Sequence, residues 1–269
     1  MRPIPLDDPA DPRLAPYAAI RERDLVGRQG RFVAEGEVVL RVLLSGRSRF
    51  CAESVLLAPE RLPALEAALA AAGDIPVYIA ARPVMSAVAG FPIHRGVLAI
   101  GRGGPVSDPD VLVPDGPALL LGLVGLTNHD NVGGLFRNAA AFGADGVLMD
   151  GATCDPLYRK AIRVSAGTSL TVPYGRVPDG AALLDVCARR ALVPVALAPG
   201  GEDIAALPPL PRALLLLGTE GTGLPEALMA RARRVGIPMA PGVDSLNVAV
   251  AGAVALHRLG GGRLTSPGR

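Results

Sequence analysis

The sequence of 269 residues is short of lysine and of aromatic side chains. Its only lysine is Lys160, tryptophan is absent, and aromatic residues make up 3% of the chain. A P-loop for nucleoside triphosphates needs Gly-Lys followed by Ser or Thr, and Lys160 follows an arginine, so that kind of nucleotide hydrolysis is excluded. Two further fingerprints are missing, the Gly-x-Gly-x-x-Gly turn of nicotinamide dinucleotide folds and the Gly-x-Ser-x-Gly elbow of serine hydrolases.

Cysteine and histidine are equally scarce. The chain has three of each, far apart in the sequence: Cys51, Cys154, Cys187, His94, His129 and His257. An odd number of scattered cysteines fits neither a disulfide framework nor a zinc site, and the histidines show no ligand spacing. We therefore expect no bound metal and a reduced, cytoplasmic setting.

Long apolar runs are absent, although 50% of the residues are hydrophobic and only 19% are charged. This composition favours a packed core over disorder. The longest apolar stretches, near 117–126 and 246–256, fall short of the roughly 18–20 residues that a membrane-spanning helix needs. The first residues mix acidic side chains with proline and lack an apolar core. We therefore expect neither a secretory signal nor a membrane span.

An excess of charge of either sign is absent too. The net charge is +2, so the chain has no broad positive field to attract nucleic acid. Any contact with nucleic acid must come from local groups of basic side chains. Two such groups are present, and either also fits an ordinary solvated surface: Arg21, Arg23, Arg28 and Arg31 in one, Arg159, Lys160 and Arg163 in the other.

The distribution of glycine, proline and aspartate indicates two domains. The stretch 101–117 is rich in these residues and lacks periodicity, as a linker does. We place a first domain at 1–103, the linker at 104–116 and a second domain at 117–269. The length of the chain suits two domains better than one.

Strands and helices alternate in both predicted domains. In the first domain we expect helices at 35–45 and 60–72 and strands at 53–58, 75–80 and 96–100. In the second we expect strands at 118–124, 146–149, 193–198, 213–217 and 235–239, with helices at 131–142, 180–191, 225–234 and 245–258. The alternation predicts the α/β class.

Three short polar loops in the second half carry the functional signal. They are Asn131-x-Gly133-x-x-x-Arg137, Gly218-Thr219-Glu220-Gly221-x-Gly223 and Ser245-Leu246-Asn247. Each follows or faces a predicted buried strand. Loops at the carboxyl ends of parallel strands meet in one crevice, where open α/β sheets bind ligands. The sequence therefore predicts one site built from three distant parts of the chain.

Each loop also has an ordinary interpretation when it is taken alone. Asn131 and Ser245 are good N-caps for the helices that follow them, and a glycine-rich turn after a strand is common. Arg137 is harder to explain in this way, because it interrupts an apolar helix and its side chain leans back toward the Asn131 loop. The three loops in this order are much more specific than any one of them.

The order and spacing of the loops resemble the SpoU/TrmH branch of the SPOUT family of RNA methyltransferases. The likeness is close over 115–259 and looser over the first hundred residues, where 32–37 and 94–99 are similar to parts of that family's substrate-binding domain. The resemblance implies an α/β fold with a SPOUT-type parallel sheet and a C-terminal trefoil knot, preceded by a small α/β substrate-binding domain. It also implies S-adenosylmethionine as the cofactor.

The same resemblance assigns roles to residues and a reaction, the transfer of a methyl group to a ribose 2′-hydroxyl in RNA. One departure is that Asn128-His129-Asp130 precede Asn131, where the family often has Asp-Pro. We interpret Arg137 as a group that orients and stabilises charge, because a guanidinium does not readily lose a proton. The implied cofactor contacts are Thr127, Gly218, Ile237, Met239 and Leu246, and the implied catalytic set is Asn131, Arg137, Glu220, Ser245 and Asn247.

The RNA class and the assembly are further expectations. The separate first domain favours ribosomal RNA, with transfer RNA as the alternative substrate, and a catalytically idle RNA-binding relative is a second alternative. The last helix, at 245–258, is apolar almost all round, so it should be buried on several sides. We therefore expect a homodimer with this helix in the interface.

Overall fold

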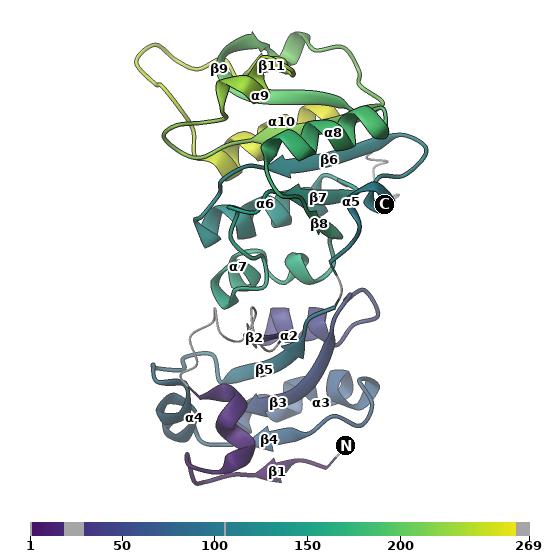
Figure 1. Cartoon of the computed structure of the whole chain (residues 1–269). Coiled ribbons are helices and arrows are strands. Elements are labelled where there is room, and N and C mark those ends of the chain that lie inside the picture. Colours follow the sequence, from purple (N-terminus) through teal and green to yellow (C-terminus); the bar gives the residue numbers. More distant parts are fainter. Residues whose placement is uncertain (1, 19–29, 105, 262–269) are drawn as a thin grey trace, which may run out of the picture. The chain divides into compact units, whose positions relative to one another are not determined.

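The computed structural model describes residues 2–18, 30–104 and 106–261 (Figure 1). Contacts between residues divide the chain into two compact units. The first unit contains Met1–Pro105 together with Asp155–Thr171, and the second contains Val106–Cys154 together with Val172–Arg269. Most of the basic group expected near the N-terminus lies outside the described residues, namely Arg21, Arg23 and Arg28.

The first unit is built on a five-stranded mixed sheet. The strand order is β1 (Ile4–Pro5), β4 (Val77–Ile79), β3 (Cys51–Leu57), β5 (Val97–Arg102) and β2 (Arg31–Glu35). Strands β1, β4 and β3 run parallel, whereas β5 is antiparallel to both of its neighbours. The helices that accompany the sheet are α2 (Glu37–Leu43), α3 (Leu62–Ala71), α4 (Arg82–Ala89), η1 (Pro12–Tyr17) and η3 (Pro59–Arg61).

The elements predicted for the first domain are found, with ends shifted by a few residues. The sequence pattern does not predict β1, β2 or α4. These elements are two, five and eight residues long, which is too short for a clear hydrophobic periodicity.

The segment 155–171, expected within the second domain, packs in the first unit. It contains α7 (Arg159–Val164) and η4 (Thr168–Leu170). Nη1 of Arg159 donates to the Glu35 carboxylate at 2.8 Å, and the backbone N–H of Arg49 donates to the carbonyl of Leu170 at 2.9 Å. These contacts join the segment to residues far away in the sequence.

The second unit is built on a six-stranded sheet in which every strand pair is parallel. The order is β11 (Arg233–Gly236), β9 (Val193–Asp203), β10 (Arg212–Leu217), β6 (Ala118–Leu123), β7 (Gly146–Met149) and β8 (Tyr174–Arg176). The leucine-rich strands β6 and β10 pair in the middle of the sheet and are almost entirely buried. Such continuous apolar runs are typical of parallel sheets covered on both faces. The predicted α/β fold with a parallel sheet is confirmed.

Helices cover both faces of this sheet. Helices α8 (Gly180–Arg189) and α9 (Glu226–Met229) pack against the face that presents Leu120 and Leu214. Helices α6 (His129–Ala141) and α10 (Val248–Gly260) pack together on the other face, where Gly252 of α10 meets Leu135 and Leu217. The remaining helices are α5 (Pro109–Leu112) and η5 (Ile204–Ala206). In the described part of the chain, no helix is both long and apolar enough to cross a membrane.

The segment 225–239 differs from the prediction. The helix expected over 225–234 ends at Met229, and the strand expected over 235–239 is found as β11, which begins two residues and ends three residues earlier. The reason is strand pairing, because Arg233 aligns with Val195 of β9 and Arg234 with its neighbour. Two arginines in a row predict an exposed helix surface equally well, so the local pattern does not reveal the edge strand.

The predicted first loop, 131–137, lies inside α6, and both α6 and α10 have N-caps other than the predicted ones. Helix α6 is capped by Asn128, whose Oδ1 accepts a hydrogen bond from the backbone N–H two residues on at 2.8 Å. Helix α10 is capped by Asn247, whose Oδ1 accepts from two backbone N–H groups of the first turn at 3.0 and 3.2 Å. Capping therefore explains neither Asn131 nor Ser245.

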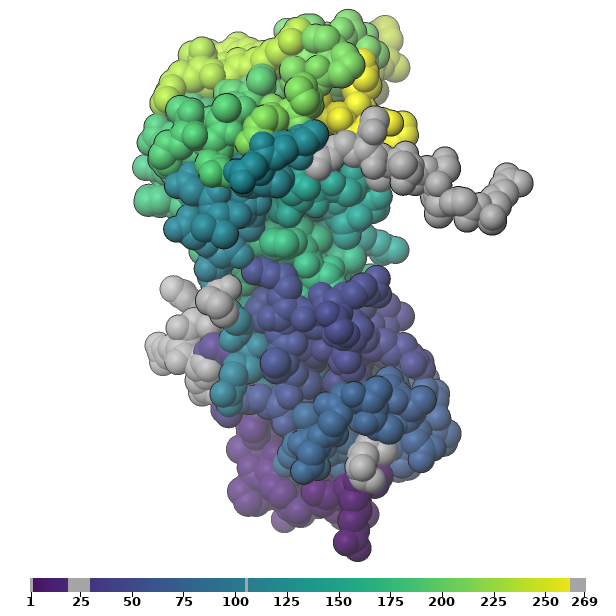
Figure 2. All heavy atoms as spheres, turned by 90° about the vertical axis from the view of Figure 1, so that its right-hand side faces the viewer, coloured from purple at the N-terminus to yellow at the C-terminus, as the bar shows by residue number. Residues whose placement is uncertain are grey.

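Helix α10 is buried on the side that packs against α6 and exposed on the other. Its buried residues are Val248, Gly252, Ala255, Leu256 and Gly260. Val250 and Val254 are 50% and 41% exposed, and part of the helix, drawn as yellow spheres, lies on the surface in Figure 2. Within a single chain, the helix expected to be buried on several sides thus leaves valines exposed.

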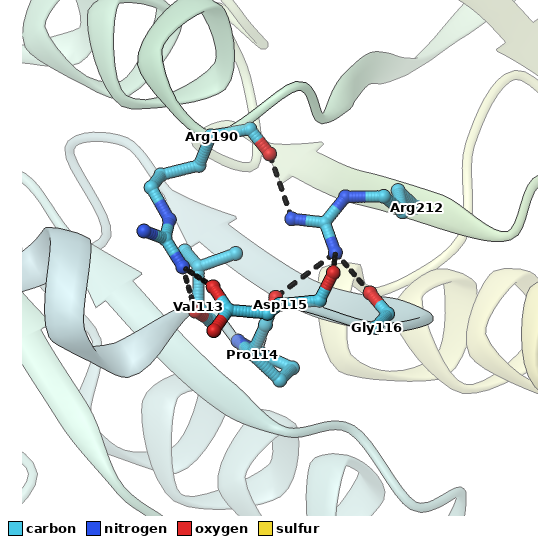
Figure 3. Close-up of polar contacts among 6 residues, drawn as sticks. All are labelled: Val113, Pro114, Asp115, Gly116, Arg190 and Arg212. Carbon is cyan, nitrogen blue, oxygen red and sulfur yellow. Dashed lines mark hydrogen bonds and ion pairs between the residues drawn. The ribbon is translucent and has the colours of Figure 1, made fainter.

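Two arginines hold the end of the predicted linker on the second unit (Figure 3). Arg212, the first residue of β10, donates through Nη1 to the carbonyl oxygens of 114–116 and through Nη2 to the carbonyl of Arg190 at 2.7 Å. Nη2 of Arg190 donates to the carbonyl of Val113 at 2.7 Å and to the Asp115 carboxylate at 2.8 Å. This end of the stretch 104–116 is therefore fixed to α8 and β10.

We expect Arg212→Ala to lower the free energy of unfolding by about 1–3 kcal/mol, because several carbonyls lose a charged donor. Arg212→Lys should recover only part of this, since one ammonium lacks the planar fork that reaches both sets of acceptors. The control is Arg189→Ala, which removes an exposed ion pair with Asp110 and should cost less than about 1 kcal/mol. Denaturant titrations followed by circular dichroism measure the stability of all three variants. Equal unfolding midpoints for Arg212→Ala and Arg189→Ala would contradict this role of Arg212.

Candidate functional site

A pocket lies where the second and third loops meet. Its volume is about 570 Å³, and it is lined mainly by 217–224 after β10 and by 245–248 before α10. Ile237 and Met239, which follow β11, complete the wall together with part of β9. The pocket is therefore at the carboxyl ends of parallel strands, where the sequence predicts it.

One side chain joins all three loops. Nδ2 of Asn247 donates to Oδ1 of Asn131 at 2.8 Å and to Oε1 of Glu220 at 2.6 Å. Its Oδ1 already accepts from the N–H groups that it caps, so the orientation of the amide is fixed. Asn131, in the first turn of α6, is only 5% exposed. Three of the predicted catalytic residues are thus in direct contact.

The second loop is folded tightly on itself. A Cβ atom at Gly218 would lie 2.4 Å from the carbonyl carbon and oxygen of Gly223. The N–H of Gly223 donates to the carbonyl of Thr219 at 3.1 Å, and the hydroxyls of Thr219 and Thr222 are 2.7 Å apart. The close backbone approach that explains the glycine at 218 is therefore made within the loop itself.

Four of the five residues expected to contact the cofactor line the pocket: Gly218, Ile237, Met239 and Leu246. The side chains of Ile237, Met239 and Leu246 give it an apolar wall. The fifth residue, Thr127, is exposed and does not belong to the lining.

The predicted catalytic residues are brought together except for Arg137. Glu220, Ser245 and Asn247 line the pocket, and Asn131 is bonded to Asn247. Arg137 is exposed on α6, six residues after Asn131, which is about 9 Å along a helix axis. No hydrogen bond or ion pair joins its guanidinium to another described residue. The sequence predicts that the Arg137 side chain leans back to Asn131, and no hydrogen bond among the described residues joins the two.

Sequence reasoning missed three residues around the site. Arg234 of β11 lines the pocket and forms an ion pair with Glu226. Asp150 and Thr153 follow β7 and accept hydrogen bonds from the backbone N–H groups of Gly125 and Leu126, in the β6–α6 connection, residues 124–128. A signal for Asp150 was available, because it directly follows the predicted buried strand 146–149. Among the described residues, no group of histidine, cysteine or acidic side chains is arranged to hold a metal ion.

Comparisons with known proteins give matches in sequence and in fold. A model of the SpoU rRNA Methylase family matches residues 118–257. A protein of Mycobacterium tuberculosis named as an uncharacterized tRNA/rRNA methyltransferase is 39% identical over 274 residues, covering 97% of this chain and 93% of that protein. The SpoU methyltransferase AviRb from Streptomyces viridochromogenes, solved with AdoMet, is 26% identical with a TM-score of 0.81, covering 94% of this chain and 99% of that chain. A solved RNA 2′-O ribose methyltransferase is also 26% identical, with a TM-score of 0.76, covering 97% of this chain and 100% of that one.

Proposed function

The chain belongs to the SpoU rRNA methylase family of RNA methyltransferases, and from that premise we propose that it transfers the methyl group of S-adenosylmethionine to a ribose 2′-hydroxyl in RNA. The observation that carries the proposal is the side chain of Asn247, which joins Asn131 and Glu220 beside the pocket. Ribosomal RNA is the substrate that we favour. The trefoil knot and the cytoplasmic setting stay predictions.

The pocket has the properties that a nucleoside cofactor requires. Its volume of about 570 Å³ falls within the roughly 300–1,000 Å³ of small-molecule sites. Ile237, Met239 and Leu246 provide apolar contacts for an adenine ring, and the backbone of 218–223 provides polar ones. AviRb, a relative in fold and sequence, is in complex with AdoMet, which supports the same cofactor here.

The chemistry asks two things of the protein. When bound, S-adenosylmethionine supplies a methyl group on a positively charged sulfur, so the leaving group needs no acid. The protein must align the 2′-oxygen with this methyl group, and it must stabilise the negative charge that grows on the oxygen as its proton passes to water. Both demands are met best by polar groups that are fixed before the substrate binds.

The joined side chains of the three loops provide such fixed groups. Asn131 and Glu220 both accept hydrogen bonds from Asn247, so the loops keep one arrangement and no rearrangement is needed during the reaction. Ser245 is exposed and lines the pocket, so its hydroxyl is available to bond a ligand. We assign the orientation of the RNA and the stabilisation of charge to Arg137, whose planar guanidinium suits phosphate and oxyanion groups.

We expect Arg137→Ala to reduce methyl transfer at least about a hundredfold, as the loss of a charge-stabilising donor does in other enzymes. Cofactor affinity should be nearly unchanged, because Arg137 does not line the pocket. Arg137→Lys should restore only part of the activity, since an ammonium lacks the planar fork. Transfer assays and calorimetry measure the two effects, with Arg189→Ala as an exposed-arginine control. Near-normal transfer by Arg137→Ala would disprove the assignment.

The first unit offers a basic surface to RNA, which supports its role as the substrate-binding domain. The segments 32–37 and 94–99 meet at one end of its sheet, where the N–H of Gly36 donates to the carbonyl of Val97 at 3.0 Å. Five arginine side chains gather around that point: Arg61, Arg82, Arg95, Arg159 and Arg163. Arg82 forms an ion pair with Glu60, and Arg159 and Arg163 form ion pairs with Glu35. Guanidinium groups bind phosphates in a bidentate manner, and such binding weakens as salt increases.

Experiment can separate the proposal from its two alternatives, transfer RNA as the substrate and a catalytically idle relative. The name of the M. tuberculosis relative covers transfer RNA as well as ribosomal RNA. An idle RNA-binding protein would need neither the pocket nor the joined polar residues. Calorimetry with S-adenosylmethionine separates the enzyme from the idle relative, and we expect one cofactor to bind per chain, in competition with S-adenosylhomocysteine and not with ATP. A protein that bound RNA and no S-adenosylmethionine would be the idle relative.

We expect a homodimer in solution, with the exposed side of α10 in the interface. Exposed apolar side chains extend from the third loop along this helix, and such patches mark protein contacts: Val243, Leu246, Val250 and Val254. The double variant Val250→Asp, Val254→Asp should be monomeric by light scattering, whereas Val111→Asp, at an exposed valine of α5, should leave the dimer intact. A wild-type mass of 27.5 kDa at micromolar concentration would contradict the dimer.

A further inference from the structure

The β6–α6 connection, residues 124–128, is held by a buried carboxylate that has no part in the proposed chemistry. Asp150 directly follows β7 and is 6% exposed. Its Oδ2 accepts from the N–H of Gly125 at 3.0 Å, and its Oδ1 accepts from the N–H and the hydroxyl of Thr153 at 2.8 and 2.7 Å. Gly125 lies between β6 and α6 and has a φ of +68°. The carboxylate thus bonds to the turn at the residue where the chain needs glycine.

Thr153 binds the next residue of the β6–α6 connection, Leu126. Its Oγ1 accepts from the N–H of Leu126 at 3.2 Å, and the carbonyl of Leu126 accepts from the N–H of Cys154 at 2.8 Å. On the other side, Nη1 of Arg176 donates to the carbonyls of Asp150 and Thr153 at 3.4 and 3.1 Å. Gly125 and Leu126, two consecutive residues of the β6–α6 connection, are therefore both bound to the turn 150–154.

The same connection lies against the second loop, at Thr219. A Cβ atom at Gly125 would lie 3.2 Å from Cγ2 of Thr219, and Thr219 lines the pocket. Helix α6 begins shortly after Leu126, and Asn131 in its first turn is bonded to Asn247. The positions of Gly125 and Leu126 therefore set where Asn131 meets the other two loops.

We propose that Asp150 and Thr153 are positioning residues for methyl transfer, which fix the β6–α6 connection so that Asn131, at the start of α6, is held in register with Glu220 and Asn247. The inference rests on the proposed function. A carboxylate is required at 150 because donors approach both of its oxygens. The amide of asparagine has only one acceptor oxygen, so Asp150→Asn leaves a donor on one side without an acceptor.

The test compares Asp150→Asn with a matched variant at the opposite end of the same strand. Asp145 precedes β7, and its carboxylate accepts from the N–H of Leu119, in β6, at 2.8 Å. Asp145→Asn therefore disturbs a comparable bond away from the loop. We expect Asp150→Asn to lower kcat about tenfold or more, with the KM for RNA and the Kd for S-adenosylmethionine nearly unchanged, and Asp145→Asn to keep the wild-type kcat.

The wild-type protein distinguishes the possible failures. If it neither binds S-adenosylmethionine nor methylates RNA, the proposed function fails. If it does both, and Asp150→Asn transfers methyl groups as fast as Asp145→Asn, only the positioning role is overturned.

Thr153 gives a second test in case Asp150→Asn does not fold. Thr153→Val keeps the shape of the side chain but removes the acceptor of the Leu126 N–H, whereas Thr153→Ser keeps the hydroxyl. We expect the valine variant to lose kcat and the serine variant to retain it. The effects of Thr153→Val and Asn131→Ala on kcat should also combine to less than their product, since both act through the same loop. Equal kcat for the valine and serine variants would overturn the proposal.

Discussion

Asn247→Ala should abolish methyl transfer, with a fall in kcat of at least about a hundredfold. One amide group bonds to Asn131, to Glu220 and to the first turn of α10. Its removal frees the first and second loops from the third and leaves the buried Asn131 without this donor. The lost helix cap costs about 1 kcal/mol of stability, which is small beside the expected effect on the rate.

Two variants separate the effect on the rate from the loss of the cap. Asp179→Ala removes the N-cap of α8, where Oδ1 accepts from the N–H of Ala182 at 2.9 Å, and Asp179 does not line the pocket. This variant should lose similar stability and keep methyl transfer. Asn247→Asp keeps the cap acceptor but places a carboxylate beside Glu220 in place of a donor, so it should be as inactive as Asn247→Ala. Normal transfer by Asn247→Asp would show that the bonds among the three loops are not needed.

Gly218→Ala should weaken the binding of S-adenosylmethionine by about fivefold to 150-fold, the equivalent of the roughly 1–3 kcal/mol that overpacking costs. The added Cβ atom would lie 2.4 Å from the backbone of Gly223. Backbone cannot turn aside as a flexible side chain can, so the loop must open. The loop forms much of the pocket wall, and its opening displaces the contacts proposed for the cofactor.

Gly221→Ala is the matched control in the same loop. A Cβ atom at Gly221 would have no neighbour within 4 Å, and its φ is not among the positive values that disfavour other residues. Calorimetry should therefore give a nearly wild-type Kd for Gly221→Ala and a much higher one for Gly218→Ala. Equal Kd values for the two variants would place the cofactor away from this loop.

The central sheet of the second unit could be predicted because its strands are continuous apolar runs. The leucines of 118–124 and 213–217 leave no polar face, which is the pattern of a parallel sheet covered on both sides. Both strands are found there and pair with each other. Hydrophobic periodicity also reveals α6 and α8, which each bury one face.

Helix starts were harder to predict because the sequence offers several suitable caps close together. Asn128 and Asn131 are equally good N-caps by residue type, and so are Ser245 and Asn247. Asn131 instead accepts a hydrogen bond from Asn247, 116 positions later. No local rule describes such a bond, so the cap is decided by tertiary structure.

The packing of 155–171 in the first unit could not be predicted for a similar reason. Its ion pair joins Arg159 to Glu35, 124 positions earlier. Helix α7 has six residues, too few for a clear apolar face. The segment is short, and its partners are distant in the sequence.

The meeting of the second and third loops at one pocket could be predicted, since strand ends bring together loops that the sequence already marks as polar and rich in glycine. The sequence of the loops does not show which residues outside them hold them in place. Asp150 and Thr153 bind the backbone N–H groups of Gly125 and Leu126. Every residue except proline has a backbone N–H, so the sequence does not mark the partners of such bonds. The position of Arg137 relative to the pocket also depends on where α6 begins.

The account is tested most directly by methyl transfer from labelled S-adenosylmethionine to bulk ribosomal RNA and to bulk transfer RNA, each followed by alkaline hydrolysis. A methyl group on the 2′-oxygen prevents alkali from cleaving the next phosphodiester bond, so the label stays in dinucleotides. We predict labelled dinucleotides from ribosomal RNA with the wild-type protein and none with Asn247→Ala. Label in dinucleotides from transfer RNA alone would identify the alternative substrate. Label found only in mononucleotides, or in neither RNA, would contradict ribose methylation by this protein.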